Sequence, residues 1–191
     1  MRRDPVDAII GFPNQSHWDQ FQADTRYLTH IGGHQTEVAV VFPLSGEVTA
    51  FVRGGNEIEW WHIAQDWVRE IRASRRSWGE PVVERMKELK LDGGRIGVSG
   101  LSGLLRAPEG TVVAGILEKV RRAFPGARFE NATELLQEAR AVRGTEEIAP
   151  RKYSTAWSRR YSRRRNPALW KLRWLRRSGT RSSSTAATIP R

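Results

Sequence analysis

Apolar residues in the first 150 positions follow two patterns, short continuous runs and stripes at helical spacing. Runs rich in Val, Ile, Thr and Phe predict strands, whereas apolar residues three or four positions apart between charged residues predict helices. The strands are predicted at 6–10, 36–42, 48–52, 66–71, 95–98 and 127–129, and the helices at 80–91, 111–124 and 134–142. Because strands and helices alternate, we predict an α/β fold with a mixed β-sheet flanked by helices.

The residues between these segments predict how several of them begin, end or connect. Pro43-Leu44-Ser45-Gly46-Glu47 separates two β-rich runs and predicts a hairpin with a loop of about five residues. Asp92-Gly93-Gly94 is typical of a helix end, and either Asn131 or Thr133 is predicted to cap the last helix. Asn56 to Glu59 is interpreted as an acidic turn.

Charge divides the chain into two parts. The whole chain has 32 Lys and Arg against 21 Asp and Glu, a formal net charge of +11. Residues 151–191 contain 13 of the basic residues and no acidic one, so residues 1–150 hold 19 basic and 21 acidic residues. We therefore predict a domain at 1–149 and an irregular basic tail at 150–191, because the tail also lacks apolar periodicity.

Composition excludes several classes of protein and site. The chain has no cysteine, which excludes disulfides, thiol nucleophiles and Cys-ligated metal centres. It has no apolar run of roughly 18 residues, so we expect neither a transmembrane helix nor a membrane partner. The apolar run after Arg2-Arg3 is too short for the core of a signal peptide, and we therefore expect a cytoplasmic protein.

The four histidines, His17, His30, His34 and His62, are predicted to have loop or surface roles rather than to bind a metal. His30 and His34 have the four-residue spacing of helical zinc ligands, but Gly32-Gly33 between them disfavours a helix. The glutamate that a metalloprotease of that type uses as its base is also missing from this segment. The sequence thus assigns no metal ligand.

Gly97-Val98-Ser99-Gly100 is similar to the tight turn around a nucleophilic serine. The order Gly-x-Ser-x-Gly fails, because Gly100 follows Ser99 directly. A loop after a strand is the favoured interpretation, and the Lys of a phosphate-binding loop does not follow. An enzyme that acts through Ser99 or the histidines is the least favoured hypothesis, and no catalytic residue is assigned.

Trp60 and Trp61 are the candidate interface residues. Adjacent indole rings point in different directions, so we expect at least one of them to be exposed. Packing in the core or between domains is favoured over contact with a substrate. Because an exposed apolar patch drives association, this face of the domain is expected to mediate self-association.

Several motifs occur in a characteristic order along residues 6–149. They are Asp7-Ala8-Ile9-Ile10, Thr25-Arg26-Tyr27-Leu28-Thr29, Gly32-Gly33, the hairpin, Arg95-Ile96-Gly97-Val98, and the Arg- and Glu-rich stretch Ala139–Ala149. Together they resemble the amino-terminal domain of the creatinase, prolidase and aminopeptidase P family of metallopeptidases. The last stretch is similar to the junction that leads into the catalytic domain of that family.

The resemblance implies a domain without catalytic machinery. In the family, the following domain binds two divalent metal ions through two Asp, one His and two Glu, and it cleaves Xaa-Pro peptides or, in creatinase, hydrolyses a guanidino group. After Ala149 this chain has no Asp, Glu or His, and hard divalent cations need such ligands. We therefore expect no cofactor in this chain and no activity of its own.

Two interpretations of residues 150–191 are open. Arg side chains for phosphates and Trp157, Trp170 and Trp174 for base stacking would give weak, non-specific nucleic-acid binding. An acid-free stretch rich in Arg, Ser and Trp is also what GC-rich coding DNA gives when it is read out of frame, and the abrupt change after Ile148-Ala149 favours this frameshift. The favoured hypothesis is a truncated protein that keeps only a non-catalytic domain, with a structural or oligomerisation role; a nucleic-acid-binding module is the alternative.

Overall fold

The computed structural model of the chain describes residues 5–13, 22–33, 36–103 and 107–142, together with 144 and 148. The chain divides into two compact units, Met1–Val142 and Arg143–Arg191. The expected tail at 150–191, with its three tryptophans, lies outside the described residues. Within the ranges above, no helix has the length and apolar content needed to cross a membrane.

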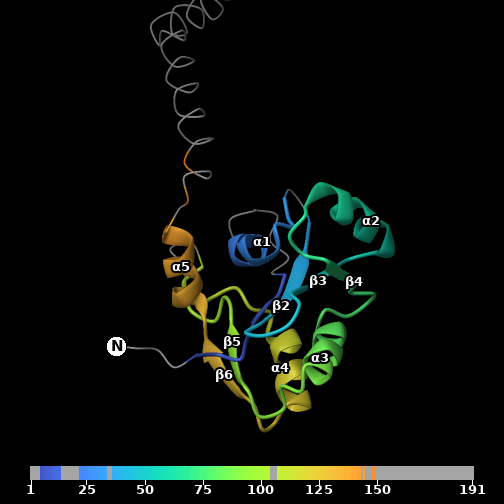
Figure 1. Cartoon of the computed structure of the whole chain (residues 1–191). Coiled ribbons are helices and arrows are strands. Elements are labelled where there is room, and N and C mark those ends of the chain that lie inside the picture. The colour runs from blue at the N-terminus through green and yellow to red at the C-terminus, as the bar shows by residue number, and fades with distance from the viewer. Residues whose placement is uncertain are drawn as a thin grey trace, which may run out of the picture. The chain divides into compact units, whose positions relative to one another are not determined.

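A six-stranded sheet in the order β4-β3-β2-β1-β5-β6 forms the centre of the first unit (Figure 1). Strand β2 is antiparallel to β1 and β3, whereas the pairs β1–β5, β5–β6 and β3–β4 are parallel. The sheet is therefore mixed, as the sequence predicts. The strands are β1 (Ala8–Gly11), β2 (Val38–Pro43), β3 (Thr49–Val52), β4 (Glu70–Ala73), β5 (Arg95–Val98) and β6 (Arg128–Asn131).

Helices pack on both faces of this sheet, and adjacent residues of β2 point to opposite layers. Val41 packs in one cluster with Met86 and Val120, whereas Val40 packs in another with Leu28 and Leu136. Helices α3 and α4 thus cover one face, and α1 and α5 cover the other (Figure 1). The helices are α1 (Ala23–Thr29), α2 (Gly55–Ala64), α3 (Gly79–Glu88), α4 (Ala114–Ala123) and α5 (Thr133–Ala141).

The predicted α/β class is confirmed, and each predicted strand and helix has a counterpart. The ends differ by up to four residues, most at β4, where the prediction starts at Asp66 and the strand starts at Glu70. The predicted hairpin is also confirmed, because β2 and β3 are antiparallel and the five residues 44–48 connect them.

Two helices, α1 and α2, are missing from the prediction. The interpretation of Asn56 to Glu59 as an acidic turn is wrong, because these residues form the first turn of α2. Apolar side chains lie on more than one side of α2, so no single stripe marks it as a helix in the sequence. The cap of α5 also differs: Ala132 occupies the N-cap position, and the side-chain oxygen of Asn131 accepts a hydrogen bond from the N–H of Thr133 at 3.0 Å.

An ionic cluster fastens α3 to the edge strand β4. The guanidinium of Arg72 binds Glu70 on its own strand and Glu88 of α3, the latter at 2.7 Å. The guanidinium of Arg85 lies 2.9 Å from Glu70 and 2.8 Å from Glu88. Hydrogen bonds from Arg72, and then from Arg85, lower the pKa of Glu88 to about 2.

This cluster predicts an acid-sensitive contribution to stability. The folded-state pKa of Glu88 lies below its unfolded value of 4.5, so the stabilisation is complete above about pH 4.5 and is lost as the pH falls toward 2. The Glu88 side chain is 45% exposed, so solvent screening limits the effect to about 1 kcal/mol or less. Chemical denaturation of Glu88→Gln should show this loss at pH 7 and none near pH 2, and Glu84→Gln, on the same helix, is the control. Parallel pH profiles for wild type and Glu88→Gln would contradict it.

Candidate functional site

Helix α2 carries apolar residues on two opposite sides. Its inner side includes Ile58 and Trp61, which pack against a buried cluster that contains Val38, Val52 and Ile71. None of its ten residues is fully buried, however. A helix with apolar residues on two sides normally contacts protein on both of those sides. The outer side of α2 therefore differs from an ordinary solvated helix face.

The outer α2 face consists of Trp60, Ile63 and Trp67, which are 62%, 83% and 51% exposed. Their spacing of three and four residues is that of a helical stripe, although α2 ends at Ala64. Trp67 is held in place, because its indole N–H donates a hydrogen bond to the carbonyl of Leu28 at 2.9 Å. Three large apolar side chains are thus exposed within eight positions of the chain, and exposed apolar surface favours contact with another protein.

The structure thus separates the two predicted interface residues. Trp60 is exposed, and Trp61 packs against the core, so the expectation that at least one ring is exposed holds. No sequence motif marks Ile63 and Trp67 as exposed apolar residues. The spacing of positions 60, 63 and 67 is a signal only where the chain is helical, and the sequence pattern does not predict α2.

The Ser99 loop follows β5 as a turn, in agreement with the favoured interpretation. The Ser99 hydroxyl donates a hydrogen bond to Asp24 Oδ2 at 2.6 Å, and Arg140 binds the other oxygen of Asp24. Ser99 is buried, and the hydroxyl contacts a carboxylate rather than a histidine. This arrangement joins α1, α5 and the loop after β5 through one shared carboxylate.

The described histidines lie apart from this cluster. His30 is exposed at the end of α1, where its ring centre lies 6.4 Å from that of Trp67, and His62 is exposed on α2. His17 and His34 lie outside the described residues. Across the part of the chain that the structure describes, no group of three or more His, Asp or Glu is arranged to hold a metal ion.

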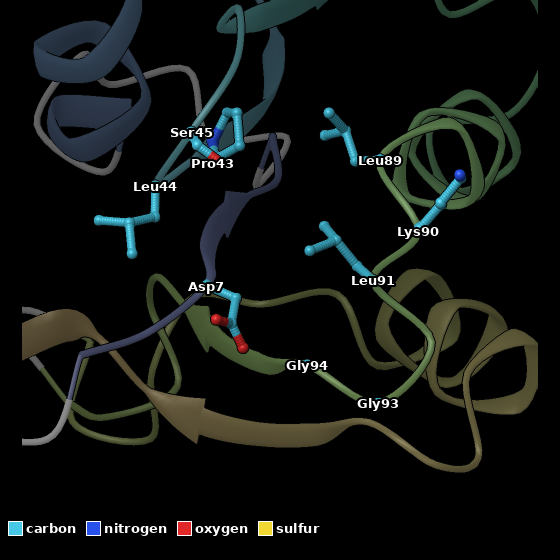
Figure 2. Close-up of a pocket in the computed structure, with 9 residues that line it drawn as sticks. All are labelled: Asp7, Pro43, Leu44, Ser45, Leu89, Lys90, Leu91, Gly93 and Gly94. Atoms are coloured by element: carbon cyan, nitrogen blue, oxygen red, sulfur yellow. The ribbon is translucent and has the colours of Figure 1, made fainter.

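A hollow of about 420 Å³ lies at the amino-terminal ends of β1 and β5 (Figure 2). Its lining comes from three segments, namely the start of β1, the turn after β2 and the loop between α3 and β5. No sequence motif indicates this hollow, because its lining residues are separated by up to 87 positions. The lining residues are Asp7, Pro43, Leu44, Ser45, Leu89, Lys90, Leu91, Gly93 and Gly94.

The Asp24 cluster predicts a large effect of one substitution. Asp24→Ala would leave the buried Ser99 hydroxyl and the Arg140 guanidinium without their shared acceptor, so the free energy of unfolding should fall by about 2–3 kcal/mol. Asp92→Ala, at an exposed turn, should change it by less than about 0.5 kcal/mol. Chemical denaturation of both variants measures the difference. Equal stabilities would show that the cluster contributes little.

Comparison with solved structures finds the same fold in peptidases. The chain superposes on an X-Pro aminopeptidase from Thermotoga maritima with a TM-score of 0.56 and 13% identity, over 75% of this chain and 36% of that one. A prolidase from Thermococcus sibiricus gives 0.51 and 14%, over 75% and 35%. A proline dipeptidase from Streptococcus pneumoniae gives 0.50 and 14%, over 72% and 89%. No family model and no curated protein sequence matches the chain.

These similarities establish the fold and confirm, at that level, the resemblance seen in the motifs. The chain spans about a third of the length of the Thermotoga and Thermococcus proteins and most of the Streptococcus chain. Most of each longer peptidase therefore has no counterpart in the described fold.

Proposed function

We propose that this chain is the non-catalytic amino-terminal domain of a truncated Xaa-Pro peptidase-like or creatinase-like protein. It has no activity of its own and has a structural or oligomerisation role in the parent enzyme. The observation that carries the proposal is the shared fold, which aligns with 36% of an X-Pro aminopeptidase and leaves the rest of that protein unmatched. The absence of Asp, Glu and His after Ala149 supports it, because a site for two divalent cations needs those ligands.

The proposal predicts that the purified chain is inactive. With added manganese, cobalt or zinc it should not hydrolyse Xaa-Pro dipeptides, longer Xaa-Pro peptides or creatine. Product formation is followed by chromatography, with an intact Xaa-Pro peptidase as the positive control. Turnover that is abolished by a chelator and that co-purifies with the chain through two different columns would refute the proposal.

The structural role is proposed to act through self-association of the outer α2 face. The sheet edges are poor alternatives, because β4 and β6 are four-residue strands and carry charged residues such as Arg72 and Arg128. The exposed rings of Trp60 and Trp67 are the residue type that contributes most at protein interfaces.

Sedimentation analysis over a range of concentrations tests this role. Association should persist at high salt, because the contact is apolar and salt screens the repulsion between chains that each carry a net charge of +11. Trp60→Ser and Ile63→Ser should each weaken association by about tenfold or more. Leu44→Ser, which removes an apolar residue that is 70% exposed elsewhere, is the matched control. A monomer at every concentration, or an equal effect of Leu44→Ser, would contradict the role of this face.

Nucleic-acid binding through the basic tail is the second candidate function. The observation that favours it is the presence of 13 Lys and Arg without one acid in residues 151–191. Affinity for RNA or DNA from such a tail falls steeply as salt rises, since binding releases counterions. The genomic DNA downstream separates the two origins of the tail: a shifted frame that encodes acidic, His-containing α/β sequence supports the frameshift.

A further inference from the structure

The hollow between β1, the β2–β3 turn and the α3–β5 loop is open and largely polar, with leucine and proline side chains beside one carboxylate. Leu89 and Leu91 extend toward the same open space, and Pro43 lies across it (Figure 2). Leu89 and Leu91 supply the apolar surface that an aliphatic group would cover, whereas the exposed Leu44 side chain points away from them (Figure 2). The volume of about 420 Å³ lies in the range of small-molecule sites.

The Asp7 carboxylate is held in a fixed orientation. Its Oδ2 accepts a hydrogen bond from the backbone N–H of Arg95 at 2.7 Å, while the backbone of Asp7 pairs with Arg95 and Leu44 on either side. Asp7 Oδ2 also lies only 3.2 Å from where a Cβ on Gly94 would be, so the glycine leaves room for the carboxylate. The other oxygen, Oδ1, has no hydrogen-bond partner among the residues that the structure describes.

The free Oδ1 of Asp7, beside leucine side chains, favours an ammonium group over a guanidinium group as its ligand. A guanidinium binds a carboxylate best through two parallel hydrogen bonds, and here one of the two oxygens already has a backbone donor. An ammonium group is a compact charge that needs only one acceptor, and its aliphatic stem lies well on leucine side chains. We propose that this hollow is a binding site for a primary ammonium on an aliphatic stem, with the ammonium at Asp7 and the stem against Leu89 and Leu91.

Lys90 at the rim does not compete for this position. Its side chain points away from Asp7 (Figure 2), and its backbone has the left-handed φ of 55°. The space beside Gly93 is also unoccupied, because a Cβ at this position would meet no atom within 4 Å. The ammonium therefore has access to the carboxylate from solvent.

Nuclear magnetic resonance titration of the full chain with n-butylammonium chloride tests the site. We expect saturable shifts of the Gly93 and Gly94 amides and of the Leu89 and Leu91 methyl groups. Asp7→Asn keeps an acceptor for the Arg95 N–H but removes the charge, so it should weaken binding by about tenfold or more. Asp92→Asn, an exposed acid beside the hollow that does not line it, is the matched control and should bind as wild type.

Two comparisons examine the chemistry of the ligand. 1-Butanol, which has the same stem without the charge, and n-butylguanidinium should both bind more weakly than n-butylammonium, and Leu89→Ala should weaken the binding of all three. An acetylated and amidated Ala-Lys-Ala peptide distinguishes the sources: tighter binding than n-butylammonium indicates a lysine of a partner protein, and weaker binding indicates a free amine. The absence of saturable shifts, or equal binding of butanol and of the amine to wild type and Asp7→Asn, would overturn the proposal. Because this test uses no peptidase substrate, its failure leaves the proposed function untouched.

Discussion

Burial of the central strands on both faces is the constraint on which the rest of the structure depends. Five of the six residues of β2 are fully buried, and all four residues of β3 are. A strand in this position can carry no polar face, so both of its sides must be covered by helices. The apolar stripes of α3 and α4 cover one side, while α1, α2 and α5 share the other. The short α1 and the two-sided α2 follow from this need, because the second face has to be covered by helices with weak patterns.

The sequence predicts the elements whose local pattern agrees with their environment. Val82 and Met86 of α3 repeat at helical spacing on a helix with one buried side, and β2 is a continuous β-branched run. The pattern of helix α2 does not predict a helix, because apolar residues lie on both its inner and its outer side. Trp61 packs against the core, whereas Trp60 is exposed. The contact of Ser99 with Asp24 joins positions 75 apart, and the hollow at Asp7 depends on three separate turns. No local pattern encodes such contacts.

The two surface features of the domain differ in what they require of a partner. The outer α2 face is apolar and exposed, and the indole of Trp67 is held by a hydrogen bond to Leu28. The hollow at Asp7 is concave and has one charge with a fixed direction. They involve different elements, so occupancy of one leaves the lining residues of the other unchanged.

The pairing of β1 with β5 has a consequence for the order of folding during synthesis. Ala8 lies beside Ile96, so the parallel pair β1–β5 cannot form until about half of the chain has left the ribosome. The β2–β3 hairpin, in contrast, joins residues a few positions apart and can form early. Until β5 emerges, β1 has one unpaired edge of apolar residues, the kind of surface that promotes aggregation of nascent chains. A ribosome that paused before residue 98 had left it would prolong the time for which this edge of β1 is unpaired and open to aggregation.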